Sequence, residues 1–144
     1  MLSAASKADN IRKFEEIGTH PAANHNAIAE ALAFHQAIGT ERKAARLRYL
    51  NDRWAKRVER LPGVKILNSR EPNQAWGLFN VSLGTDPSKA YDFLWTKYRI
   101  ITAVIKRDDY QGLRITPNVY TTLAEVDRFA DVMEDVLRKG LPTS

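Results

Sequence analysis

The sequence predicts an α+β domain, in which a small, mostly antiparallel sheet has helices packed on one face and is preceded by two long helices. Three observations support this fold class. Helical apolar spacing fills residues 21–61, two pairs of short β-rich segments flank one helix within residues 62–144, and a capped helix closes the chain. Runs of strands that are separated by a single helix are typical of α+β domains. At 144 residues the chain is expected to form one domain, with residues 1–20 as a short lead-in.

The first long helix is expected over residues 22–38, which are rich in alanine and other strong helix formers. Gly39 is expected to end this helix, and Thr40 is expected to cap a second helix over residues 41–60. Both helices carry apolar residues at helical spacing. The stripes consist of Ala27, Ala31, Phe34 and Ile38 in the first helix and of Leu47, Leu50, Trp54, Val58 and Leu61 in the second.

Two strands and a third helix are expected next. Pro62 and Gly63 break the second helix, and residues 64–67 and 76–83 are β-rich. Asp86 is a capping residue followed by proline, so a helix is expected to begin there. The side chains expected to face a core are Trp76, Leu78 and Val81 in the second strand and Tyr91, Leu94, Trp95 and Tyr98 in the helix.

The last part of the chain predicts two more strands and a closing helix. The strands are expected over residues 100–105 and 113–116, because these segments are short and rich in β-branched residues. Thr122, with Glu125 three residues later, forms a capping box, so a helix is expected over residues 123–139. Its apolar stripe consists of Val126, Phe129, either Val132 or Met133, and Val136.

Composition excludes several classes of protein and site. The chain is 44% hydrophobic and its mean hydropathy is −0.42, which suits a soluble protein with a core. No apolar run reaches the roughly 18 residues of a membrane helix, and no signal peptide is recognised, so we expect a cytoplasmic protein without a membrane partner. The absence of cysteine excludes disulfides and thiolate metal sites. Since no helical face gathers His20, His25 and His35, we expect no metal site.

Basic residues are concentrated in one segment. Residues 40–60 contain eight lysines and arginines and three acidic residues, a surplus that equals the whole net charge of +5. A basic helix can indicate a nucleic-acid-binding module. The alternative is the solvated face of a packed helix. Since no helix-turn-helix, zinc or RNA-binding signature accompanies the segment, we expect no nucleic-acid partner.

A candidate binding residue, Arg114, lies at the expected end of a strand, before a loop that leads into the last helix. A guanidinium group is always charged and offers a planar fork of donors that matches a carboxylate or a phosphate. The alternative is an ordinary surface arginine in a salt bridge.

The run 113–116, followed by residues 120–122 and 125–127, resembles the C-terminal signature of class V aminotransferases. This family includes cysteine desulfurases, selenocysteine lyases and isopenicillin N epimerase-like proteins. The resemblance implies the C-terminal domain of a fold-type I pyridoxal-phosphate enzyme, in which Arg114 holds the α-carboxylate of an amino-acid substrate. Thr121 stands where the family usually has asparagine.

A second segment, residues 14–21, resembles the Gly-Thr element of the same family. The resemblance implies a homodimer in which Gly18 and Thr19 reach the phosphate of the partner subunit's pyridoxal phosphate. The alternative for Thr19 is a helix cap before Pro21. The sequence of residues 29–39 and the arginine-rich second helix resemble those of the isopenicillin N epimerase-like subgroup.

Two absences limit what this chain is expected to do alone. The loop 106–111 contains no cysteine, which excludes persulfide chemistry of the cysteine desulfurase type. No lysine lies in a sequence like the family's Schiff-base motif, and the large cofactor-binding domain has no counterpart here. We therefore expect the C-terminal third of an epimerase, lyase or aminotransferase, with no cofactor bound and no catalysis by this chain alone. The alternative is a stand-alone, self-associating interaction module.

Overall fold

The computed structural model describes residues 21–69, 71, 74 and 77–141. The chain divides into two compact units, Met1–Gly39 and Thr40–Ser144. Gly18 and Thr19 lie outside the described residues, as does Trp76.

The described part of the first unit is helix α2, Ala22–Ile38, which has the predicted extent. It begins after Pro21 without a side-chain cap and ends at Gly39, whose φ of 85° suits a residue without a Cβ atom. None of the residues of α2 is buried. Phe34 of the predicted apolar stripe is 57% exposed, and its ring contacts that of the neighbouring His35 edge to face. Ile38, at the end of the stripe, is half-buried.

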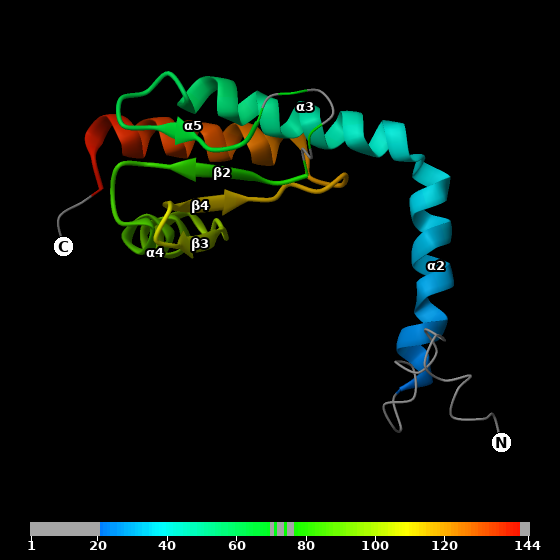
Figure 1. Ribbon diagram of the computed structural model, residues 1–144. Helices are drawn as coiled ribbons and strands as arrows, with labels where there is room; N and C mark the ends of the chain where they lie inside the picture. Colours follow the sequence, from blue (N-terminus) through cyan, green and yellow to red (C-terminus); the bar gives the residue numbers. More distant parts are fainter. Residues whose placement is uncertain (1–20, 70, 72–73, 75–76, 142–144) are drawn as a thin grey trace. The chain divides into compact units, whose positions relative to one another are not determined.

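The second unit contains a four-stranded antiparallel sheet in the order β1-β2-β4-β3 (Figure 1). Both pairs of expected strands are present, but each strand has different bounds because strand ends depend on pairing partners that a single segment does not reveal. The strands are β1, Lys65–Ile66; β2, Phe79–Ser82; β3, Ala103–Lys106; and β4, Gln111–Ile115.

The described part of the second unit contains three helices: α3, Thr40–Val58; α4, Pro87–Tyr98; and α5, Leu123–Lys139. Thr40 is the first residue of α3 rather than a residue outside it. The Asp86 side chain accepts a hydrogen bond from the Ser88 amide, which is the expected cap of α4. Both reciprocal bonds of the predicted capping box between Thr122 and Glu125 are present at the start of α5.

One face of the sheet and the three helices form a single core. Along β2 and β4 alternate side chains are fully or almost fully buried, since successive residues of a strand point to opposite faces. Trp54 of α3 contacts the rings of Phe79 and Phe129 edge to face, with centroids 6.0 and 5.4 Å apart. The predicted arrangement, with helices on one face of a mostly antiparallel sheet, is confirmed. Strand residues in this core are Phe79, Val81, Leu113 and Ile115.

Two of the side chains expected in the core are exposed. Leu78 is 40% exposed, because the alternation of β2 places Phe79 and Val81 inward and their even-numbered neighbours outward. Trp95 is 38% exposed, because the face of α4 that is buried in the core carries Ala90 and Leu94 instead. The indole ring of Trp95 lies under the guanidinium group of Arg99, 5.1 Å from its centroid.

Candidate functional site

Arg114 lies on the face of the sheet opposite to the core. In β4 it stands between the buried Leu113 and Ile115, and its own side chain is exposed. Its partner in β2 is Asn80 and its partner in β3 is Ala103. Residues directly opposite each other in antiparallel strands share a face, so these side chains lie together on the open side of the sheet.

A hollow of about 420 Å³ lies at Arg114. It extends from the middle of the sheet to the turn between β3 and β4. Apolar side chains form part of its wall, and an amide, a phenol and three cations supply its polar groups. The lining residues are Leu78, Asn80, Val104, Ile105, Lys106, Arg107, Tyr110 and Arg114.

The three cations of this hollow have different surroundings. The Lys106 ammonium pairs with Asp86 at 2.9 Å, and the Arg107 guanidinium lies 3.6 Å from Asp109. Among the residues that the structure describes, the guanidinium of Arg114 has no hydrogen-bond acceptor and no carboxylate at ion-pair distance. Because Arg114 keeps its whole fork of donors available there, it can bind a carboxylate or phosphate through two parallel hydrogen bonds. The predicted alternative, a surface salt bridge, has no described partner.

Asn80 is the residue of this site that sequence reasoning missed. Its segment is β-rich, so a strand is predicted, but the register that places Asn80 opposite Arg114 depends on residues 34 positions apart. The Asn80 amide donates to the Asn68 side chain at 2.6 Å, and its carbonyl accepts from the Leu67 amide at 2.9 Å. The side-chain oxygen, Oδ1, is buried and has no partner among the described residues.

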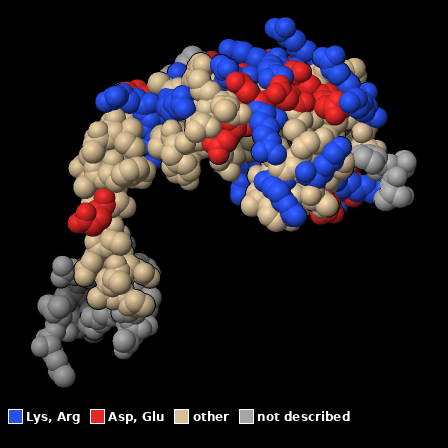
Figure 2. Space-filling model, turned by 180° about the vertical axis from the view of Figure 1, so that it is seen from behind, with Lys and Arg blue, Asp and Glu red and all other residues tan. Residues whose placement is uncertain are grey.

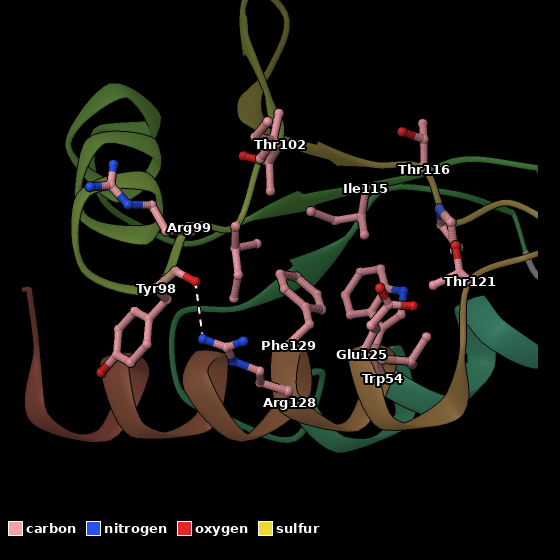
Figure 3. A pocket seen from close by; sticks show the side chains of 14 residues that line it. Trp54, Tyr98, Arg99, Thr102, Ile115, Thr116, Thr121, Glu125, Arg128 and Phe129 are labelled. Carbon is pink, nitrogen blue, oxygen red and sulfur yellow. Dashed lines mark hydrogen bonds between the residues drawn. The ribbon is translucent and has the colours of Figure 1, made fainter.

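A second cavity, of about 320 Å³, lies on the other side of the sheet, between the residues that precede β3 and the start of α5 (Figure 3). Figure 3 shows Ile115 pointing from β4 towards Phe129 and Trp54. Arg128 donates a hydrogen bond to the Tyr98 carbonyl at 3.2 Å beside this cavity. Since Ile115 points towards the helices, this cavity is separated from Arg114 by the sheet.

Two of the basic residues of α3, Arg53 and Arg57, have partners on α5. Arg53 binds both carboxylate oxygens of Asp127, at 2.6 and 2.8 Å, and Arg57 bridges Asp131 and Glu134, at 2.6 and 2.8 Å. Figure 2 shows acidic side chains lying among the basic ones on this part of the second unit. Helix α3 is thus a packed helix with a charged face, which is the predicted alternative to a nucleic-acid site.

These ion pairs change the pKa values of the carboxyl groups. The hydrogen bonds from Arg53 lower the pKa of Asp127, and the hydrogen bond from Arg57 lowers the pKa of Glu134. A donor that binds the charged form of a carboxylate favours that form. Both groups are therefore ionised at neutral pH and hold α3 against α5.

Two other expectations concern metals and membranes. No group of three or more potential metal ligands is found among the described residues, which include His25 and His35 but not His20. No helix in the described part of the chain is long and apolar enough to cross a membrane.

Comparison with known proteins identifies relatives over most of the chain. No protein-family model matches the sequence. An isopenicillin N epimerase from Streptomyces clavuligerus is 31% identical over 126 residues, which cover 86% of this chain and 32% of that protein. An isopenicillin N epimerase from Amycolatopsis lactamdurans is 27% identical over 130 residues, which cover 89% of this chain and 33% of that protein. The predicted resemblance to the class V aminotransferase family is confirmed. The chain spans about a third of the length of the epimerases it matches.

Solved structures of the same fold are also found. The cystine C–S lyase C-DES, in a complex with its reaction product cysteine persulfide, matches with a TM-score of 0.63 and 21% identity, over 83% of this chain and 31% of the lyase. A variant of C-DES with glycine linked covalently to its pyridoxal-phosphate cofactor matches with the same TM-score and coverage. These likenesses show that the fold of this chain also occurs within the longer chain of C-DES.

Proposed function

We propose that residues 1–144 are the counterpart of the C-terminal third of a pyridoxal-phosphate-dependent enzyme of the class V aminotransferase family. In this proposal the guanidinium of Arg114 binds the α-carboxylate of an amino-acid substrate. The observation that carries the proposal is the position of Arg114, exposed on the open face of the sheet, in a hollow, with no acceptor among the described residues. The relatives named isopenicillin N epimerase and the lyase structures support the family.

The residues of the hollow fit an anionic substrate with an apolar portion. The guanidinium fork matches a carboxylate, and hydrogen bonds to charged groups are stronger than those between neutral groups. Leu78 and Ile105 supply apolar surface beside the arginine. Pyridoxal phosphate, when bound in the whole enzyme, supplies an electron sink for reactions at the substrate's α-carbon. The reaction of the whole enzyme would be an epimerisation, an elimination or an amino transfer. The contribution of this chain would be to hold and orient the substrate.

The resemblance in residues 14–21 supports a role for Gly18 and Thr19 in cofactor binding. A hydroxyl group is a suitable donor to a phosphate, and glycine permits close approach of the backbone. We propose that these residues reach the phosphate of the cofactor in the partner subunit of a homodimer. The remaining parts of the cofactor site would come from a large domain outside this chain.

Titration of the ¹⁵N-labelled 144-residue chain with L-alanine tests the role of Arg114. We expect saturable shifts of amide resonances in β2, β3 and β4, with an affinity in the millimolar range or weaker, as a single charge-assisted contact at an exposed site allows. Arg114→Gln should weaken binding at least about tenfold, which corresponds to the roughly 1.5–3 kcal/mol of a hydrogen bond to a charged group.

Two controls make this titration specific. L-Alaninamide, which lacks the carboxylate, should produce no comparable shifts. Arg107→Gln, at the turn of the same hollow, should bind L-alanine much as the unchanged chain does. Shifts that survive in Arg114→Gln, or that are clustered in another part of the chain, would contradict the proposed role of Arg114.

A second candidate function is self-association, and the surface of α2 favours it. Ile28, Leu32 and Phe34 are each more than half exposed, and none of the residues of this helix is buried. Contiguous exposed apolar surface often marks a site of interaction. Light scattering across a concentration series tests it: a module that self-associates through α2 should become monomeric in Leu32→Glu. An unchanged mass in that variant would exclude α2 as the interface.

A further inference from the structure

The backbone hydrogen bonds of Asn80 show which type of cross-strand pair it forms with Arg114. Its backbone amide and carbonyl are directed to Asn68 and Leu67, on the β1 side of the strand. They therefore do not bond across to β4, and Asn80 and Arg114 form a pair of the type without mutual backbone hydrogen bonds. In such pairs the Cα atoms are about 4.5 Å apart and the side chains approach more closely than in the alternate pairs.

Each of the two side chains has a hydrogen-bonding group without a partner among the described residues, and the groups are of opposite kinds. The Oδ1 atom of Asn80 is a buried acceptor without a donor, whereas the guanidinium of Arg114 is a set of donors without a described acceptor. A buried acceptor that lacks a partner is costly, and the cost is removed when a donor reaches it. Guanidinium has five N–H donors, of which a bidentate carboxylate uses two, so Arg114 can bind both groups at once.

We propose that Asn80 is a positioning residue for Arg114: its Oδ1 accepts a hydrogen bond from the guanidinium and turns the fork towards the substrate carboxylate. Two hydrogen bonds hold the backbone of Asn80 in place. Its short side chain therefore starts from a fixed point, whereas the side chain of Arg114 is long and exposed. Holding the arginine in one orientation lowers the entropy that is lost when a carboxylate binds. This inference rests on the proposed function for its effect on binding. In the structure Oδ1 has no partner among the described residues, so the contact requires the Arg114 side chain to turn towards Asn80.

The side-chain Nε–Hε resonance of Arg114 reports this contact directly. It is identified in the ¹⁵N-labelled 144-residue chain by its loss in Arg114→Lys. Asn80→Leu keeps the approximate shape of the side chain and removes the acceptor. We expect it to shift the Arg114 resonance in the ligand-free chain and to weaken L-alanine binding by about two- to tenfold, the range for one lost hydrogen bond.

Asn80→Asp gives an opposite and more specific expectation. A carboxylate opposite Arg114 would occupy the guanidinium fork itself, so the Arg114 resonance should move further than in Asn80→Leu while L-alanine binding is lost. A purely structural role of Asn80 predicts reduced stability in both variants without this divergence of the Arg114 resonance. Ser82→Ala, two residues along the same face of β2 and paired with Lys65, is the matched control and should leave both readouts unchanged.

The outcomes separate this inference from the proposed function. If Arg114→Gln loses L-alanine binding but Asn80→Leu keeps both the affinity and the Arg114 resonance of the unchanged chain, the positioning role is overturned and the proposed function stands. If Arg114→Gln binds normally, the proposed function fails, and the ligand-free resonance then decides: a shift in Asn80→Leu supports the contact and no shift overturns it. Urea unfolding of each variant shows whether it is folded under the conditions of the titration.

Discussion

At the scale of single residues, Gly112 of β4 has less room for a side chain than the described glycines 63, 77, 84 and 140. A Cβ atom there would lie 2.3 Å from the Val81 carbonyl oxygen and 2.9 Å from its carbon. Both are backbone atoms of the neighbouring strand, so they cannot rotate away. We expect Gly112→Ala to destabilise the chain by about 1–3 kcal/mol, as overpacking of a close contact does. Urea unfolding measures this loss.

Gly77→Ala is the matched control for that substitution. Among the described residues, its added Cβ would meet only the Leu47 side chain, at an ordinary distance of 3.9 Å. The expected change is within about 0.5 kcal/mol, as for most surface substitutions. Equal losses in the two variants would show that the close approach of β2 and β4 is not what requires glycine at position 112.

Sequence reasoning at this scale succeeded where the deciding contacts are local. The Asp86 cap and the capping box of Thr122 and Glu125 involve residues at most three positions apart, and all are present. It failed for Leu78 and Trp95, whose exposure is decided by which face of the strand or helix meets the core. Apolar character alone does not specify that face, because it depends on register and packing across the whole sheet.

At the scale of elements, the ion pairs between α3 and α5 should make stability depend on pH. Hydrogen bonds from Arg53 and Arg57 lower the folded-state pKa values of Asp127 and Glu134 below those of the unfolded chain. This stabilisation is present above the ordinary carboxyl pKa and is lost as the pH falls through the lowered values. We expect the free energy of unfolding to decline from about pH 5 downwards.

The variant Arg53→Gln tests the origin of that decline. Without the guanidinium, the pKa of Asp127 should return towards its ordinary value, so less stability remains to be lost in acid. The slope of unfolding free energy against pH should become shallower than in the unchanged chain. Arg60→Gln, exposed just beyond α3, should keep the original slope. Identical slopes in all three proteins would mean that the Arg53 pair does not contribute to the acid dependence.

The ion pairs between α3 and α5 also affect whether the basic segment, residues 40–60, can bind nucleic acid. Arg53 and Arg57 are bound to carboxylates of α5, so they are not free to neutralise phosphates. We expect binding of the chain to random duplex DNA to be weak at physiological salt and to show a shallow salt dependence, since few counterions would be released. Anisotropy titrations at several salt concentrations measure the slope. A steep slope that Arg53→Gln or Arg57→Gln reduces would contradict this expectation.

At the scale of the whole molecule, the sequence motifs indicated the resemblance to class V aminotransferases and the α+β class without the structure. Periodicity and caps specify which segments are helices and strands, and the order of those segments leaves few ways to build a sheet with helices on one face. The sheet order β1-β2-β4-β3 and the pairing of Asn80 with Arg114 could not be read in this way. Both result from long-range packing, and they determine which polar groups meet in the site. The predicted roles of Gly18 and Thr19 stay predictions, since both lie outside the described residues.

The last prediction concerns what this length of chain can do with the cofactor. The chain spans about a third of the isopenicillin N epimerases that it matches. The resemblance to class V aminotransferases assigns none of its lysines to a Schiff base. We expect pyridoxal phosphate to produce no saturable absorbance change with the 144-residue chain, and borohydride to trap no single lysine. Scattered reaction at exposed lysines would be linear in cofactor concentration, and peptide mapping would distribute it over many sites. A saturable absorbance change, with the cofactor trapped on one specific lysine, would mean that this chain forms a cofactor site by itself. The proposal that Arg114 binds the substrate while a separate large domain holds the cofactor would then be wrong.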